Sequence, residues 1–128
     1  MDQQIFEKYI KQAINQVPKE LRDKIKNLAF VVEDNVRTAS SNERIIKTRG
    51  VLLGLYQGVP LPNRSGYYSG VLPDKITIFK KPIEQLAGYN EQKMAELIHE
   101  VVHHEIGHYF GMSENQVRAW ERKRKNQK

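Results

Sequence analysis

Two histidines four residues apart, followed by a glycine and then a carboxylate, constrain this chain more than any other feature. They lie in the run His104-Glu105-Ile106-Gly107-His108-Tyr109-Phe110-Gly111-Met112-Ser113-Glu114. On an α-helix, His104 and His108 project from one face, about 40° apart in rotation and about 6 Å apart along the axis. Zinc–nitrogen bonds of about 2.0–2.1 Å suit two imidazoles placed in this way. The run therefore predicts a helix that offers two adjacent ligands to a metal ion.

The neighbouring residues indicate that such a site is catalytic. Glu105 follows the first histidine and can act as general base toward a water on the metal. Gly111 can end the helix, because glycine enters the left-handed conformation at little cost. The chain can then turn back and bring the carboxylate of Glu114 to the metal. Three protein ligands and one open position are typical of catalytic zinc, so we expect one Zn²⁺ per chain, held by His104, His108 and Glu114.

A second copy of the two-histidine pattern lies five residues earlier, at His99-Glu100-Val101-Val102-His103. The two copies point in different directions, because adjacent residues on a helix are about 100° apart. The later copy is favoured, since it alone has a glycine three residues after its last histidine and a carboxylate three residues further on. The earlier copy has Ile106 and Tyr109 at those places. Its histidines are therefore interpreted as polar positions that are structural or that support a ligand or substrate by a hydrogen bond.

Size and composition exclude several classes of protein. The chain has 128 residues, which predicts one domain over residues 1–128 with a single modest core. It has no cysteine, which excludes disulfides, thiolate zinc sites and cysteine nucleophiles. No segment approaches the roughly eighteen apolar residues of a membrane span, and the first residues lack the pattern of a secretory signal. A cytoplasmic protein without a membrane partner is expected.

The net charge of +6 is concentrated at the C-terminal end. Six of the 21 Lys and Arg residues lie from Arg118 onward, against only one of the 15 Asp and Glu residues. The chain before Arg118 is therefore nearly neutral. Basic ends of this kind are usually solvated, so the basic tail, about residues 118–128, is not expected to bind nucleic acid.

Hydrophobic periodicity predicts both helices and strands. Helices are expected over about residues 2–16, over a short stretch opened by Pro18 that carries Leu21 and Ile25 inward, over 91–110, and for a turn or two within 115–124 with Trp120 packed inward. A short helical turn is expected over 82–86. Strands are expected over 28–32, 51–56 and 75–79, the last of them half-buried because its polar and apolar residues alternate. A loop is expected over 35–48, and a long turn-rich connection over 60–73 is a candidate rim or lid.

Several segments outside the histidine run are long and particular. They are Pro18-Lys19-Glu20-Leu21, Gly54-Leu55-Tyr56-Gln57-Gly58-Val59-Pro60-Leu61 and Leu72-Pro73-Asp74-Lys75-Ile76-Thr77-Ile78-Phe79-Lys80-Lys81-Pro82-Ile83-Glu84. Together with the H-E-x-x-H-x-x-G motif from His104 to Gly111, they resemble the small bacterial minimal-zincin family of metallopeptidases over nearly the whole chain. The resemblance implies an α+β fold with N-terminal helices, a small mixed β-sheet and a long active-site helix beneath it. In that family the third ligand is usually aspartate, so the longer Glu114 implies a different geometry at this ligand.

The resemblance also implies an activity, namely hydrolysis of peptide bonds in a peptide or protein substrate by a zinc-activated water. Glu105 would take the proton of that water and pass it to the leaving amine. Arg64, Tyr67 and Tyr68 of the long connection are candidates for stabilising the developing oxyanion. A strand along the cleft, near 76–79 or near 53–56, is expected to bind an extended substrate by β-addition.

Other functions remain open at this point. A metal-dependent nuclease fits the basic residues and the helix, although small bacterial ribonucleases with a related helix have a third histidine where this chain has Glu114. A catalytically idle domain that keeps zinc and binds a partner is a second alternative. A regulatory peptidase of the phage repressor-cleaving type is a third, although the chain shows no helix-turn-helix region. The sequence indicates neither the physiological substrate nor the oligomeric state.

Overall fold

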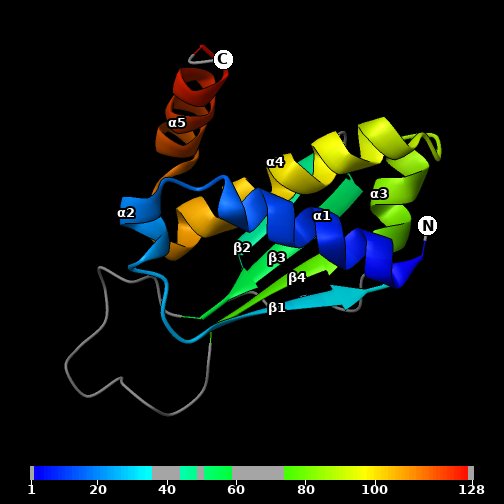
Figure 1. The fold of residues 1–128 in the computed structure, drawn as a ribbon, viewed down its shortest axis with the longest axis horizontal. Helices are drawn as coiled ribbons and strands as arrows, with labels where there is room; N and C mark the ends of the chain where they lie inside the picture. Colours follow the sequence, from blue (N-terminus) through cyan, green and yellow to red (C-terminus); the bar gives the residue numbers. More distant parts are fainter. Residues whose placement is uncertain (1, 36–43, 49–50, 59–73, 127–128) are drawn as a thin grey trace.

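The computed structural model describes residues 2–35, 44–48, 51–58 and 74–126 (Figure 1). These residues form helices on one side and a small β-sheet on the other. In chain order the elements are α1 (Gln3–Asn15), α2 (Lys19–Arg22), β1 (Leu28–Glu33), β2 (Arg44–Thr48), β3 (Val51–Gln57), β4 (Asp74–Phe79), α3 (Lys80–Leu86), α4 (Glu91–Tyr109) and α5 (Glu114–Asn126). The expected α+β class, with N-terminal helices and a long helix that carries the histidine run, is confirmed.

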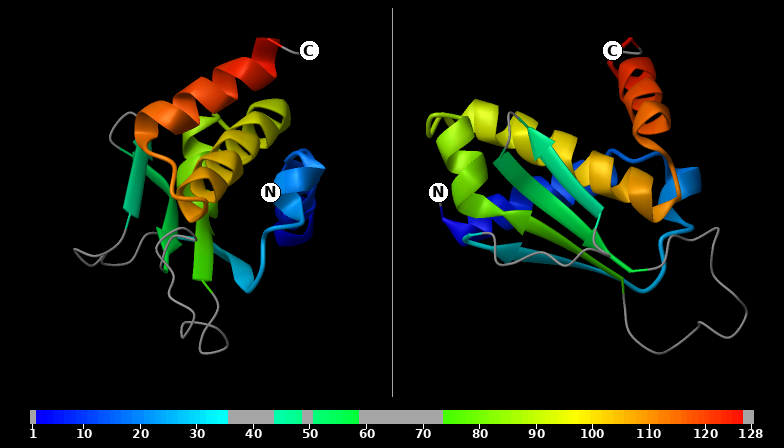
Figure 2. Two further views of the ribbon diagram at one scale, coloured as in Figure 1. Left: turned by 90° about the vertical axis from the view of Figure 1, so that its left-hand side faces the viewer. Right: turned by 180° about the vertical axis from the view of Figure 1, so that it is seen from behind.

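The sheet is mixed and has the strand order β1-β4-β3-β2. β1 runs parallel to β4, whereas β3 is antiparallel to both β4 and β2. Helices α1 and α4 lie side by side over one face of the sheet, and α5 extends away from the body (Figures 1 and 2). Helix α4 contacts β3 and β4, the two inner strands of the described sheet.

The prediction of a loop over 35–48 is wrong for its last five residues, since Arg44–Thr48 form the edge strand β2. Only two isoleucines, Ile45 and Ile46, lie between the charged residues of this segment, so its apolar pattern is too short to indicate a strand. Pairing with β3 supplies the missing signal, with Ile45 opposite Leu55 and Ile46 opposite Gly54. Charged residues are common on edge strands, where they oppose aggregation.

β4 lies deeper than the alternation of its residues predicts. Five of its six residues are buried, and these are Asp74, Ile76, Thr77, Ile78 and Phe79. The strand is flanked by β1 and β3, and Phe79 belongs with Leu52 and Leu55 to a second apolar cluster apart from the main core. Tertiary position, rather than alternation, therefore decides how much of β4 meets water.

The strand order also corrects the expectation about substrate binding. The stretches 53–56 and 76–79 lie in β3 and β4, and each of these strands has a neighbour on both sides. A strand whose backbone groups are paired on both edges cannot accept another. The edges of the described sheet belong to β1 and β2.

The main core lies between α1, α4 and the sheet. Its fully buried side chains include Phe6 of α1, Leu53 of β3, Ile76 and Ile78 of β4, and Ile98, Val102 and Ile106 of α4. At the edge of this contact the hydroxyl of Tyr9 donates to Glu91 at 2.7 Å, and this hydrogen bond raises the pKa of Tyr9. Helix α1 is thus held to α4 by apolar packing along its length and by a polar contact near the start of α4.

A buried polar pair lies where β3 ends and β4 begins. The hydroxyl of Tyr56 donates to the carboxylate of Asp74 at 2.6 Å, and both residues are about 1% exposed. A Cβ atom on Gly58 would fall 2.3 Å from the carboxylate carbon of Asp74, so only glycine fits there. The ring of Tyr56 meets that of Tyr109 edge to face, with centroids 6.2 Å apart. The pair therefore connects the strand ends to the last residue of α4.

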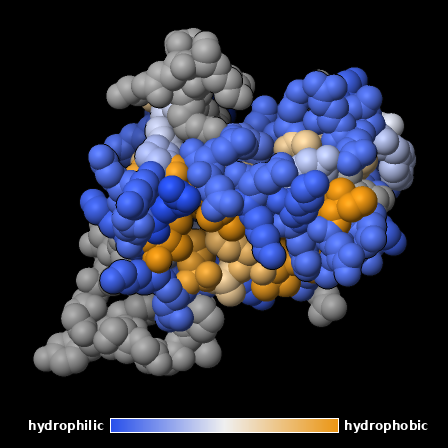
Figure 3. Space-filling view, viewed as in Figure 1, coloured by the Kyte–Doolittle hydropathy of each residue, from blue (hydrophilic) through white to orange (hydrophobic). Residues whose placement is uncertain are grey.

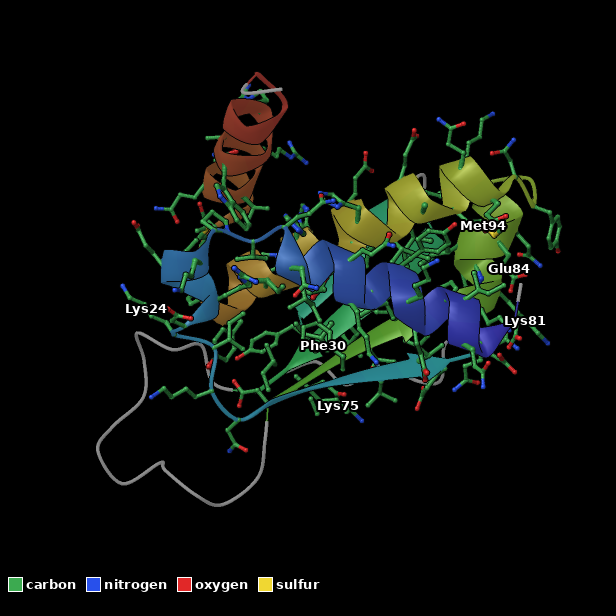
Figure 4. The ribbon with its side chains drawn as sticks, in the orientation of Figure 1. Lys24, Phe30, Lys75, Lys81, Glu84 and Met94 are labelled. Atoms are coloured by element: carbon green, nitrogen blue, oxygen red, sulfur yellow. The ribbon has the colours of Figure 1, made fainter. Side chains whose placement is uncertain are left out.

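On the face seen in Figure 3, an apolar band lies between α1 and β1. Leu28, Phe30 and Val32 of β1 are partly buried against the core there. Phe30 of β1 lies on the face of the sheet toward α1, whereas Lys75 of β4 lies on the opposite face (Figure 4). In the part of the chain that the structure describes, no helix has the length and apolar character needed to cross a membrane.

Candidate metal site on helix α4

Helix α4 begins and ends with specific caps. At its start the side chain of Asn90 accepts a hydrogen bond from the Lys93 amide at 3.0 Å. At its end Gly111 has a φ of 82°, the left-handed conformation that the sequence predicts for this glycine. The amide of Gly111 donates to the His108 carbonyl, and the amide of Met112 donates to the Gly107 carbonyl, each at 2.9 Å. These two bonds form a Schellman motif, which reverses the chain directly after the histidine run.

The two histidines of the favoured pair lie next to one another on α4. The ring centroids of His104 and His108 are 5.4 Å apart and their planes are inclined by 60°. Two imidazoles on one tetrahedral zinc, with Zn–N bonds of about 2.0–2.1 Å, place their centroids about 5 Å apart. His104 is partly exposed and His108 is 5% exposed. The spacing of the two rings thus fits a shared metal ion.

The turn after α4 fixes the orientation of His108. Its Nδ1 lies 3.2 Å from the carbonyl oxygen of Met112. A carbonyl can only accept, so Nδ1 carries the proton and the neutral ring has its lone pair on Nε2. Metal-bound histidines commonly hold their second nitrogen in this way, which sets both tautomer and ring direction. The Gly111 turn therefore also selects the nitrogen of His108 that can bind metal.

Glu105 lies beside this pair, on the flank of α4 that faces β3. It is 0% exposed. A Cβ atom on Gly54 of β3 would fall 3.5 Å from Cγ of Glu105 and 2.5 Å from Cγ1 of Val101. The strand can approach the helix this closely only because residue 54 has no side chain. Glu105 is consequently held between the helix that carries both histidines and the strand that covers it.

The histidines of the earlier pattern have a different arrangement. Their rings are stacked, with centroids 4.1 Å apart and planes inclined by 25°. His103 is 0% exposed, and its Nε2 donates to the carbonyl of Ala13 in α1 at 2.6 Å. On its other side the ring of Trp120 is stacked at 5.5 Å, with planes inclined by 15°. His103 thus serves packing and hydrogen bonding between three helices.

Glu114 is the first residue of α5, three residues beyond the Gly111 turn. The helix begins with a capping box, in which the Gln116 amide donates to the Ser113 hydroxyl at 3.3 Å and the Ser113 amide donates to the Gln116 side chain at 2.8 Å. The side chain of Glu114 lies outside the described part of the structure. Among the side chains that are described, no three of His, Cys, Asp or Glu form a candidate metal cluster.

Two glycines with a role in this region escape sequence reasoning. The sequence indicates Gly54 only as part of a strand, and Gly107 only as an unspecified position between the motif histidines. A Cβ atom on Gly107 would fall 2.7 Å from Cγ2 of Val117, which is fully buried. A glycine inside a predicted strand or helix is the available signal, because it marks a close approach of backbone or another element. Arg64, Tyr67 and Tyr68, the candidates for oxyanion stabilisation, lie outside the described residues.

The chain was compared with models of known protein families. A family model described as zincin-like metallopeptidase matches residues 25–124, which include all four strands, α3, α4 and most of α5. No curated protein gives a significant match to the chain.

Proposed function

The chain belongs to the zincin-like metallopeptidase family, and on this premise we propose that it hydrolyses peptide bonds with one zinc ion. His104, His108 and Glu114 are the proposed ligands, and Glu105 is the proposed general base. The observation that carries the proposal is the paired arrangement of the two histidines. Their rings are 5.4 Å apart, and Nδ1 of His108 is held by the Met112 carbonyl, so both rings suit one metal ion.

Each residue then has a distinct task. When bound, zinc acidifies a water and polarises the scissile carbonyl as a Lewis acid. The carboxylate of Glu105 accepts the proton of the attacking water and later donates it to the leaving amine. Burial of Glu105 between α4 and β3 keeps bulk water from competing for that proton. The Gly111 turn orients His108 and reverses the chain direction shortly before Glu114.

An extended substrate fits the edge strand β2 in this proposal. Gly54 of β3 covers Glu105, and Ile46 of β2 is paired with Gly54. Adjacent strands lie about 4.8 Å apart, so the outer edge of β2 is a single strand away from the strand over the general base. A peptide paired with that edge would gain backbone hydrogen bonds while its side chains remain available for selection.

A proteome-wide cleavage screen tests the proposal. Wild type and Glu105→Gln are each incubated with a peptide library, with added zinc and with a chelator. We expect zinc-dependent cleavage by wild type alone. If neither form cuts any peptide while both retain zinc, the chain acts as a zinc-containing binding domain. Zinc-dependent cleavage of RNA or DNA in a parallel assay would instead indicate a nuclease.

A further inference from the structure

Two neighbouring stripes of residues along α4 have different partners. His104 and His108 form the stripe of the proposed metal centre. His99, His103 and Gly107, spaced four residues apart, form a second stripe turned by about 100°. This second stripe is where α5 is attached, since Gly107 lies against Val117 and His103 lies against Trp120.

The attachment of α5 is a two-point contact. Val117 is 0% exposed and fills the space that a side chain on Gly107 would need. Trp120 lies one turn further along and stacks on His103 with nearly parallel planes. Residues three apart share one face of a helix. Contact at both residues fixes the tilt of α5 and its rotation about its own axis, which one contact alone would not do.

The surface that receives Trp120 is itself rigid. His103 is completely buried, its Nε2 donates to the Ala13 carbonyl at 2.6 Å, and its opposite face stacks on His99. A buried hydrogen bond to a backbone carbonyl stabilises one ring position, because other positions would leave both groups without a partner away from water. The indole of Trp120 therefore packs on the side chain of His103, which belongs to α4 and is fixed by its hydrogen bond to α1.

The position of α5 determines the position of its first residue. Glu114 lies three residues before Val117 and six before Trp120, so about 9 Å along the helix axis separates Trp120 from Glu114. From this geometry we propose that Trp120 and His103 are positioning residues, which act through α5 to hold Glu114 within reach of the metal. The inference rests on the function proposed above. In it the two copies of the histidine pattern have separate roles, one binding metal and the other placing the third ligand.

A double-mutant cycle in the full-length protein tests this inference. Zinc affinity is measured by competition with a chromophoric chelator for wild type, Trp120→Ala, Glu114→Ala and the double variant. We expect Trp120→Ala to weaken zinc binding about tenfold in the wild-type background, as loss of a supporting residue typically does. In the Glu114→Ala background the same change should alter affinity less than about twofold, because the group that it positions is gone.

Two controls separate positioning from general damage to the fold. Trp120→Phe keeps a flat ring for stacking and should bind zinc within about threefold of wild type. Arg122→Ala, an exposed position on the same helix, should leave zinc affinity unchanged. Trp120 is also the sole tryptophan of the chain, so zinc should alter the fluorescence of wild type but not that of Glu114→Ala.

The outcomes distinguish this inference from the proposed function. Equal weakening by Trp120→Ala in both backgrounds, or no weakening in either, would overturn the positioning role while leaving the metal centre intact. A wild type that binds no zinc would overturn the metal centre and the inference with it.

Discussion

Gly54 of β3 lies so close to Val101 of α4 that a Cβ atom on the glycine would fall 2.5 Å from Val101 Cγ1. This contact sets the distance between the sheet and the helix that carries the proposed site. The same glycine lies over Glu105, whose Cγ would be 3.5 Å from that added atom. The separation of β3 and α4 and the position of the proposed general base therefore depend on a single missing side chain.

Gly54→Ala should destabilise the protein by about 1–3 kcal/mol, because the added methyl group overpacks a contact that neither backbone can relieve. Urea unfolding measures the loss. In a Val101→Ala background, where Cγ1 is absent, the same change should cost less than about half as much, since coupled positions are not additive. Equal costs in both backgrounds would show that Val101 is not the obstacle.

Gly111→Ala should destabilise the protein by about 1 kcal/mol and also weaken zinc binding by about tenfold. The substitution strains a φ of 82° and disturbs the Met112 carbonyl that holds His108. Gly88→Ala is the matched control, because Gly88 has a φ of 64° and its added Cβ would contact nothing within 4 Å. It should lower stability comparably and leave zinc affinity unchanged. A similar loss of zinc affinity in both variants would show that the turn at Gly111 has no specific effect on His108 as a ligand.

His104→Ala and His108→Ala should each abolish measurable zinc binding, because either change leaves a single histidine ligand. His103→Ala should retain zinc with an affinity reduced no more than about tenfold, in keeping with a positioning role. Its larger effect should be on unfolding, by about 1–3 kcal/mol, because the Ala13 carbonyl loses a buried partner. Metal content by atomic absorption and urea unfolding provide the two measurements. Loss of zinc in His103→Ala with retention in His104→Ala would assign the metal to the earlier pattern.

Glu105→Gln should keep zinc but lower turnover by about 10²-fold or more, since the amide cannot accept the proton. Glu100→Gln is the matched control, because Glu100 has the same place in the earlier pattern and is exposed on α4. It should leave kcat within about twofold of wild type. These rates are measured on a peptide identified by the cleavage screen. Full activity of Glu105→Gln would end its assignment as general base.

Tyr56→Phe should destabilise the protein by about 1–3 kcal/mol, because it removes the hydroxyl that donates to the buried carboxylate of Asp74. Tyr89→Phe removes the hydroxyl of a side chain that is 66% exposed and should change stability by less than about 0.5 kcal/mol. Both values come from urea unfolding. Equal stability of the two variants would show that the Tyr56–Asp74 hydrogen bond adds nothing net.

The features that the sequence predicts best are determined by residues that lie close together in the chain. The extent of α4 follows from apolar spacing, and the left-handed turn at Gly111 follows from the conformational freedom of glycine. β2 is different, because Ile45 and Ile46 form a strand only when β3 lies beside them. The same holds for His103, whose acceptor Ala13 lies 90 residues earlier in the chain. Contacts between distant segments leave no periodic pattern, so sequence could offer only an unspecified polar role for this histidine.

The hydrogen bond between His103 and Ala13 has a consequence for synthesis of the protein. Helix α1 is synthesised before α4, yet it packs on buried side chains of α4. β1 likewise cannot form its pairing with β4 until β4 has been synthesised, because β2 and β3 come between these two strands in the chain. Pairing of segments far apart in sequence is slow, since the intervening chain must be closed before any contact is gained. The nascent chain therefore carries an amphipathic helix without its partner while the segments between α1 and α4 are synthesised, and folding of these elements as a unit must await the release of α4 from the ribosome.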